Sequence, residues 1–391
     1  MRLGAASCLA VLIIAMATDG RAQCPDGQDE RTIFGRRQNP ESSFSAPAGG
    51  SLRIGSEVDA VRYFRLELRR EPGGTSDGLL IVKDNDLRVV DVFRFSDLAV
   101  GGSVWTRRGT GNQATLRFEV NPGAAAKVTV AHTIGMPAEA MGNTYYSLQT
   151  EGVERFHPIY PLPNETDQAS PRAKRLADSV GFIQVGHGVG EETWCCSAVA
   201  VGTDLLLTNW HCGGTDSMPT ADYWGQDVCS QTLIDMSWDG DAVSREYQCV
   251  RAEVDQQLDL ALLRVRGIDG SQALVPVDLA SGDTTTGVVD LIHHPACKSK
   301  QETAACRILA MGPNASAQST EFTHDCDSEQ GSSGGGLFKQ SADKLVLIGL
   351  HHAGFRREVG TCKALDRVNR GVRLNAVRDF LATARAKLDQ P

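Results

Sequence analysis

The chain has 391 residues, more than one domain usually contains, so two domains are the starting expectation. Its 40 glycines, 15 prolines, short β-branched runs and scarcity of long amphipathic windows favour a mostly β protein with little helix. The formal net charge of −9 argues against nucleic acid as a partner, because phosphate binding needs a basic face that this balance does not supply.

Residues 1–22 have the form of a secretory signal peptide. Arg2 precedes an apolar stretch from Leu9 to Ala17, and the small residues Gly20 and Ala22 stand at plausible cleavage positions. The alternative is an N-terminal membrane anchor, but the apolar run is too short to span a bilayer comfortably. We therefore expect a secreted protein, periplasmic or extracellular, that is cut after Ala22 and has no membrane association.

Cysteine usage agrees with export. Removal of the signal takes Cys8 away and leaves 10 of the 11 cysteines, an even set that predicts disulfides in an oxidising compartment. A zinc site built from Cys297 and Cys306 near His293 and His294 is the alternative, but it lacks paired CxxC or HxxxH spacing. We expect a structural Cys297–Cys306 bridge and no metal.

The first part of the mature chain, residues 23–156, has the pattern of short strands. Apolar Phe64, Leu66 and Leu68 alternate with charged residues such as Arg65, which is typical of half-buried strands with one polar face. Glycine and proline clusters interrupt these runs, as expected of a small β-sandwich. The segment holds no catalytic constellation, so we interpret it as a propeptide or an accessory domain.

Residues 157–175 are predicted to be an interdomain linker. Several prolines stand among polar residues, a composition that neither packs a core nor continues a strand. Arg172, Lys174 and Arg175 form a basic cluster that a trypsin-like enzyme could cut, and a merely solvated linker is the alternative.

The β pattern then resumes in residues 176–391, where three local contexts carry chemistry. The run Leu-Leu-Leu-Thr-Asn-Trp-His-Cys indicates a buried strand that ends on His211, and Asp-Leu-Ala-Leu-Leu places Asp259 at another apolar strand. Glycines flank Ser333, which permits a sharp turn with an exposed hydroxyl. The order along the chain is thus histidine, aspartate, serine.

These contexts resemble the histidine, aspartate and serine motifs of the trypsin/chymotrypsin superfamily of serine endopeptidases. The Gly-Ser-Ser-Gly form at Ser333 and the Ile-His-His-Pro segment 292–295 resemble the bacterial lysyl and glutamyl endopeptidase branches. The resemblance implies a C-terminal chymotrypsin-like double β-barrel with the active site in the cleft between the barrels. Apolar residues at helical spacing over 372–388 indicate a C-terminal helix. The expected fold class is mostly β, with a β-sandwich-like N-terminal domain before the barrels.

The resemblance also implies a role for each residue of the motifs. Ser333 attacks the peptide carbonyl, His211 takes the serine proton, and Asp259 orients the imidazole. The backbone amides of Gly331 and Ser333 form the oxyanion hole. We therefore expect a serine endopeptidase that cleaves proteins or peptides through an acyl-enzyme, with no metal or cofactor. Relatives of the pancreatic type carry an activating aspartate at the position of Ser332, so that switch is not expected here.

Three residues are candidates for substrate specificity. Asp327 lies where trypsin carries the acid of its primary pocket, so cleavage after Lys or Arg is the electrostatic expectation. Asp366 lies in a segment similar to the one that supplies the lysine-recognising acid in lysyl endopeptidases. Either aspartate is alternatively a solvated loop carboxylate. His351 matches a histidine that binds acidic side chains in glutamyl endopeptidases, and a structural role in the pocket wall is its alternative.

The cysteines near the motifs suggest cross-links around the site. Cys212 directly follows His211 and should bridge to Cys195 or to Cys196. Cys326 and Cys362 could join the two walls of the pocket, although relatives also join the latter to an N-terminal cysteine.

Two rival functions stay open at this level. A catalytically silent protease homologue would use the cleft or the first domain to bind a protein or a glycan. A narrow esterase would cleave simple esters but not peptide amides. Fluorophosphonate labelling that Ser333→Ala abolishes would separate an enzyme from a binding module.

Overall fold

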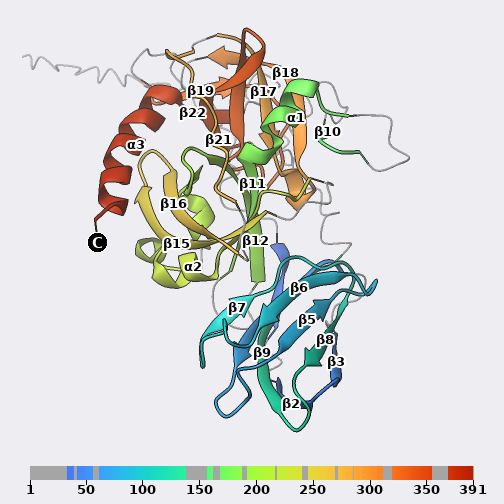
Figure 1. Ribbon diagram of the computed structural model, residues 1–391. Helices are drawn as coiled ribbons and strands as arrows, with labels where there is room; N and C mark the ends of the chain where they lie inside the picture. The colour runs from blue at the N-terminus through green and yellow to red at the C-terminus, as the bar shows by residue number, and fades with distance from the viewer. Residues whose placement is uncertain are drawn as a thin grey trace, which may run out of the picture.

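The computed structural model describes residues 33–38, 42–55, 61–137, 156–161, 168–186, 192–215, 218–239, 245–268, 272–284, 286–310, 319–354 and 369–390. The predicted signal peptide lies outside these residues, as do Cys24, Cys362 and Asp366. Within them the chain forms three sheets and short helices, which confirms the mostly β expectation (Figure 1).

The N-terminal part forms a sandwich of two sheets, as the alternating pattern predicts. One sheet has the order β1-β9-β4-β7 with β2 also paired to β9, and the other has the order β3-β8-β5-β6. Their inner faces enclose an apolar core that includes Phe64, Leu66, Leu116 and Phe118. The strands are β1 (Ile33–Gln38), β2 (Ser42–Pro47), β3 (Ser51–Gly55), β4 (Val61–Arg70), β5 (Leu79–Lys83), β6 (Val89–Arg94), β7 (Ser103–Trp105), β8 (Gln113–Glu119) and β9 (Ala125–Pro137).

The outer face of β4 differs from the expectation of a polar, exposed surface. Arg65 is completely buried and Glu67 nearly so. The reason is tertiary: carboxylates of the first barrel, those of Asp235 and Glu246, lie against Arg65. The alternation therefore predicted correctly which side chains share a face of β4. It could not reveal that the first barrel covers the polar face.

Six strands close the first barrel, in the order β11-β14-β15-β16-β13-β12 with β12 returning to β11. Runs such as Leu205–Thr208 are buried throughout, because one face lines the barrel and the other packs on neighbouring elements. The elements are β11 (Val180–Val185), β12 (Glu192–Ala200), β13 (Leu205–Thr208), β14 (Leu233–Asp235), β15 (Glu246–Asp255), β16 (Leu260–Gly267) and the helix α2 (Gln226–Gln231).

The second barrel closes in the same way, in the order β18-β17-β20-β21-β22-β19 with β19 returning to β18. Its own core contains Leu291, Phe322, Leu337 and Ile348. Its strands are β17 (Gly287–His293), β18 (Gln301–Ala310), β19 (Glu321–His324), β20 (Gly336–Ser341), β21 (Lys344–Ala353) and β22 (Asn369–Arg373).

The predicted C-terminal helix is confirmed as α3 (Leu374–Leu388). Its apolar stripe, which includes Val377, Leu381 and Leu388, is buried in a core shared with residues of both barrels. The helix therefore fastens the two barrels to each other beside their interface (Figure 1).

The predicted linker is not a solvated tether in the part that the structure describes. β10 (Phe156–Pro158) pairs with β18, and α1 (Pro171–Leu176) buries Ala173 in the core shared by the barrels. Pro158 and Pro171 fit these elements, because β10 is an edge strand and Pro171 opens a helix, where no intrahelical N–H is needed. Proline content was therefore a poor guide to whether this segment packs against the barrels.

The sandwich and the first barrel are continuous through one sheet. β1 pairs with β12 on one side and with β9 on the other, so that the sheet runs from the barrel into the N-terminal module. In the described part of the chain, no helix is long and apolar enough to cross a membrane.

Candidate active site

Antiparallel pairing brings His211 and Asp259 together. β13 and β16 pair with Thr208 opposite Ala261, so the residues that follow β13 meet those that precede β16. His211 begins a short 3₁₀ turn after β13, and Asp259 directly precedes β16. The Nδ1 atom of His211 lies 2.8 Å from Oδ2 of Asp259, and the backbone amide of His211 donates to Oδ1 at 2.9 Å.

Ser333 approaches the same imidazole from the second barrel. Ser333 lies in the loop that leads into β20, and its Oγ lies 2.9 Å from Nε2 of His211. The structure therefore brings together the three residues that the sequence analysis singled out. The arrangement allows a proton to pass from the hydroxyl to the imidazole while the carboxylate holds the opposite ring nitrogen.

Asp259 is held firmly in an unusual backbone conformation. Its φ is +52°, a left-handed value that aspartate tolerates better than most residues. The side-chain amide of Asn209 donates to its backbone carbonyl at 2.8 Å. Burial alone would raise the pKa of Asp259, but the charges of His211 and His352 and the hydrogen bonds from them hold it well below its usual range. The carboxyl is therefore ionised when the site is assembled.

His352 and Glu321 complete this network, and neither was predicted from the sequence. Nδ1 of His352 lies 3.3 Å from Oδ2 of Asp259, and its Nε2 lies 3.3 Å from Oε1 of Glu321. Burial alone would lower the pKa of His352, but the hydrogen bonds and charges of the two carboxylates raise it to about 9. The His351–His352 pair in an apolar strand was the available signal, but periodicity cannot say which strand faces Asp259.

The loop that carries Ser333 is fixed by the first barrel. Ser197 of β12 donates through its amide to the Ser333 carbonyl and through its hydroxyl to the Gly331 carbonyl, both at 2.7 Å. Gly331 and Gly334 have φ values of +91° and +83°, and a Cβ at Gly334 would come within 2.0 Å of the Ser197 carbonyl oxygen. Glycine at this position is therefore required by the close approach of β12.

Two carbonyl contacts set the direction of the amides assigned to the oxyanion hole. The Gln330 carbonyl accepts from the amide of Ala296 at 2.6 Å, and the Ser332 carbonyl accepts from Gly335 at 2.8 Å. In a planar trans peptide the N–H points away from the C=O, so the amides of Gly331 and Ser333 face away from these contacts. Among the described residues, neither amide donates to a protein acceptor.

Ser332 anchors the loop from below. Its hydroxyl lies 2.7 Å from Nδ1 of His293 and accepts from the amide of Glu329 at 3.0 Å. Burial first, and then the neighbouring His294, keeps the pKa of His293 well below its usual value, so this anchor is made of neutral groups. A neutral contact therefore holds Ser332 in place.

The specificity candidates lie in different situations. Asp327 is 1% exposed, so its alternative as a solvated loop carboxylate is wrong. Its carbonyl accepts from the hydroxyl of Thr303 at 3.0 Å. Asp366 falls outside the described residues. His351 is buried, lies 3.1 Å from a ring nitrogen of His324, and forms backbone hydrogen bonds to Gly334 and Gly335.

The disulfides decide between the sequence alternatives. Cys212 is bonded to Cys196, and a further disulfide joins Cys195 to Cys297. The predicted Cys297–Cys306 bridge is therefore wrong, because β18 extends away from the turn that holds Cys297 at about 3.3 Å per residue. Cys306 is bonded to Cys326 instead.

That last bond also excludes the predicted Cys326–Cys362 link, since Cys326 is already paired. A fourth disulfide, Cys229–Cys249, joins α2 to β15 and had not been predicted.

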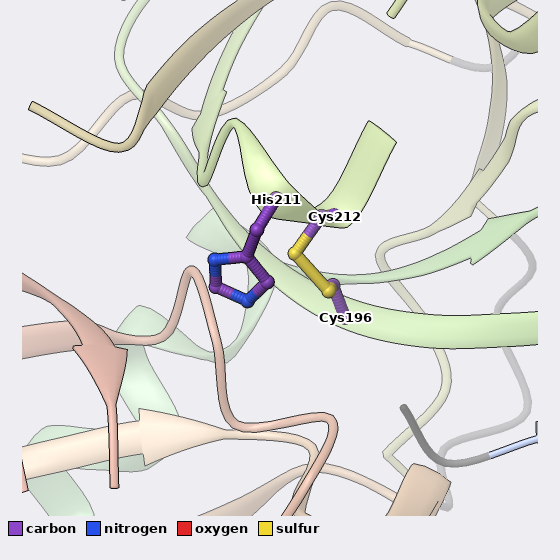
Figure 2. Close-up of side chains that lie close together, drawn as sticks. All are labelled: Cys196, His211 and Cys212. Carbon is purple, nitrogen blue, oxygen red and sulfur yellow. A yellow bond between two sulfur atoms is a disulfide. The ribbon is translucent and has the colours of Figure 1, made fainter. Parts of the chain in front are cut away.

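One group of side chains near the site has the composition of a metal centre. The sulfur atoms of Cys196 and Cys212 and a ring nitrogen of His211 lie within 4.8 Å of one another. Figure 2 shows why the group does not fit a metal: the two sulfur atoms are joined to each other, so neither is a thiolate that could bind an ion. The imidazole of His211 is turned toward Asp259 and Ser333 instead.

The chain was also compared with known proteins. Similar solved structures include the serine endoprotease of Yersinia pestis, with 18% identity, a TM-score of 0.41, and coverage of 56% of this chain and 67% of that one. The Rv3671c protease of M. tuberculosis in its active form has 18% identity, a TM-score of 0.37, and coverage of 54% and 83%. The HtrA-type protease AlgW has 21% identity, a TM-score of 0.38, and coverage of 54% and 62%.

No curated protein sequence matches the chain. The family model of the trypsin-like peptidase domain, however, matches residues 196–350. This segment holds His211, Asp259 and Ser333, so the part of the chain that carries the candidate site matches a trypsin-like peptidase domain.

Proposed function

We propose that this protein is a serine endopeptidase that hydrolyses peptide bonds through Ser333, His211 and Asp259. The observation that carries the proposal is the chain of contacts from Ser333 Oγ to His211 Nε2 at 2.9 Å and from His211 Nδ1 to Asp259 Oδ2 at 2.8 Å. Serine is a poor nucleophile unless a base within hydrogen-bond reach takes its proton, and this chain supplies that base.

In the proposed reaction, Ser333 attacks the scissile carbonyl as its proton passes to His211. The developing oxyanion is bound by the amides of Gly331 and Ser333, each of which contributes about 3 kcal/mol of transition-state stabilisation. His211 then gives the proton to the leaving amine, and an acyl-enzyme on Ser333 remains. A water molecule activated by His211 hydrolyses this ester and restores the serine.

We propose cleavage after Lys or Arg, with Asp327 as the acid that recognises the basic side chain. Its place six residues before Ser333 in the chain and its burial support this, because a negative charge held out of water attracts a cationic side chain strongly. Asp366 is the second candidate for this acid. Cleavage after Glu is the alternative, in which His351 binds the acidic side chain, since the backbone of His351 contacts the nucleophile loop.

We further propose that residues 1–22 direct secretion and that the mature chain consists of an N-terminal module (23–156), a connecting segment (157–175) and a protease domain (176–391). The four disulfides among the described residues support an oxidising compartment, since such bonds seldom persist in the cytosol.

The decisive experiment is labelling of the purified protein with a fluorophosphonate probe, followed by cleavage of a peptide library read by mass spectrometry. We expect labelling of the wild type, none of Ser333→Ala, and normal labelling of Ser230→Ala, a matched change on α2 away from the site. A folded but unreactive wild type would support a silent binding homologue. Turnover of simple esters without peptide amides would support an esterase.

The library also tests the proposed specificity. We expect cuts after Lys or Arg, and loss of that preference in Asp327→Asn, which keeps the side-chain shape and removes the charge. Loss only in Asp366→Asn would move the recognising acid to that residue. Exclusive cleavage after Glu would overturn the assignment to basic residues.

A further inference from the structure

A buried group of charges joins the N-terminal module to the first barrel. Arg65 forms ion pairs with Glu246 and, at 3.8 Å, with Asp235. Nε of Arg108 lies 3.4 Å from Asp235, and the amide of Arg108 donates to Glu246 at 3.1 Å. The side chains of Arg65, Asp235 and Glu246 are 0% exposed.

The barrel depends on these arginines. Without them the buried carboxylates of Asp235 and Glu246 would lose these cationic partners, and removing one partner of a buried ion pair is strongly destabilising. Burial alone would raise the pKa of Asp235, but the charges of Arg108 and Arg65 hold it below its usual value. The surface of the first barrel around Asp235 and Glu246 is therefore stable only when the N-terminal module covers it.

The apolar part of the same interface reaches the disulfide behind the nucleophile loop. Trp105 and Ile134 of the module pack in one cluster with Phe182 and with the bonded Cys195 and Cys297. The pairing of β1 with β12, which carries Cys195, adds backbone hydrogen bonds to this contact (Figure 1).

Trp238 links the module to that disulfide. The guanidinium of Arg108 lies over its ring, 4.8 Å from the centroid, and also donates to the carbonyl of Ser237 at 3.3 Å. Nε1 of Trp238 donates to the carbonyl of Cys297 at 3.1 Å. Arg108 of the N-terminal module thus contacts Trp238, and the only hydrogen-bond donor of the Trp238 side chain binds the carbonyl of Cys297.

The turn at Ala296 and Cys297 has an unfavourable backbone conformation that needs stabilising contacts. Ala296 and Cys297 have φ values of +48° and +58°, left-handed conformations that are energetically unfavourable for residues other than glycine. The amide of Ala296 is also the donor to the Gln330 carbonyl, at 2.6 Å. Because this contact turns the amide of Gly331 in the opposite direction, the position of the turn sets the direction of that amide.

We propose that Trp238, held by Arg108, is a positioning residue for the oxyanion-binding amide of Gly331, so that the N-terminal module is an integral part of the catalytic unit. This inference rests on the proposed peptidase function. It replaces the interpretation of the module as a removable propeptide, because removal would release Trp238 and expose the carboxylates of Asp235 and Glu246.

Trp238→Phe tests the inference, because it keeps an aromatic ring under Arg108 and removes the donor to Cys297. We expect kcat on a peptide amide to fall about tenfold, since complete loss of one oxyanion donor costs about 10²–10³. KM should change less than about twofold, and the affinity of a peptide boronate, whose adduct places an oxygen in the hole, should fall in parallel with kcat/KM. Titration of active serines corrects each rate for unfolded protein.

Tyr247→Phe is the matched control. It also removes a hydrogen bond from an aromatic side chain to a backbone carbonyl, that of Gln272, but on β15 away from the Cys297 turn. Its kcat should stay within about twofold of the wild type. If Trp238→Phe and Tyr247→Phe behave alike in a wild type that cleaves peptides, the inference is wrong and the proposed function stands. An inactive wild type would instead contradict the proposed function.

Arg108→Lys tests the link to the module. Lysine keeps a positive charge near Asp235 and loses the planar group over Trp238, so we expect a several-fold lower kcat. If the two residues act along one path, adding Arg108→Lys to Trp238→Phe should lower kcat no further. Effects that multiply in the double variant would show that Arg108 does not act through Trp238.

Discussion

Asp259 is shared between two imidazoles: its Oδ2 atom lies 2.8 Å from Nδ1 of His211 and 3.3 Å from Nδ1 of His352. Glu321 contacts the other nitrogen of His352. A buried imidazolium therefore stands between two carboxylates, directly beside the residue proposed to orient His211. This arrangement makes stability depend on pH in a way that can be measured.

His352 should stabilise the fold most at neutral and acidic pH. Its pKa is raised to about 9 in the folded protein, above the unfolded value of 6.5, so the folded state binds its proton more tightly. The stabilisation is complete below about pH 6.5 and is lost as the pH rises through 9, with an upper bound on the order of 3 kcal/mol. His352→Gln should therefore lose less stability between pH 6.5 and 9.5 than the wild type does, measured by urea unfolding. Parallel curves would contradict the assignment.

Four buried histidines should have the opposite effect on the acidic side. Burial lowers the pKa of His294 and His324 to about 3, and it lowers those of His293 and His351 well below their usual value. The unfolded chain takes up these protons first as the pH falls below about 6.5. Each histidine therefore removes stability at about 1.4 kcal/mol per pH unit until its folded pKa is reached.

The unfolding midpoint in urea should accordingly drop steeply between pH 6.5 and 4.5, and His324→Asn should make that drop shallower. A midpoint that stays constant over this range would show that these groups do not remain neutral inside the fold.

Asp259→Asn should lower kcat by about 10⁴, because an amide in this position favours the wrong tautomer of His211. The overall fold should survive, since asparagine has nearly the same shape and the hydrogen bond from Asn209 goes to the backbone of residue 259. Steady-state kinetics and circular dichroism of the same preparation check both statements. A loss below about tenfold would argue against an orienting role for Asp259.

Two disulfides offer a matched comparison: Cys195–Cys297 joins the first barrel to the second, and Cys229–Cys249 lies within the first. Cys195–Cys297 closes a separation of 102 residues and Cys229–Cys249 one of 20, so chain entropy predicts losses of about 4.7 and about 3 kcal/mol when they are removed. Replacing either pair with serine should lower the unfolding free energy. Only removal of the first pair should also lower kcat of the folded fraction, because that pair holds the turn that carries Ala296.

The comparison would contradict our interpretation if both variants kept the kcat of the wild type, or if both lost it equally. Active-site titration again separates a slower enzyme from a smaller folded fraction.

Several features of the fold and the site can be predicted from the sequence, because their signals are local. The glycine-flanked Ser333, the strand that ends on His211 and the strand that begins after Asp259 are readable from neighbouring residues. Apolar spacing over 372–388 predicted α3, and alternation around Leu66 predicted a strand of the sandwich. Each of these depends on residues a few positions apart in the chain.

Features that depend on distant partners could not be predicted in this way. His352 belongs to the site because β21, which carries it, lies beside Asp259. Cys297 is bonded to Cys195 and not to Cys306, because β18 carries Cys306 away from Cys297. Arg65 has the pattern of a solvated residue and is buried because the first barrel covers it. In each case charge pairing, burial or disulfide bonding depends on distances in space, which local periodicity does not encode.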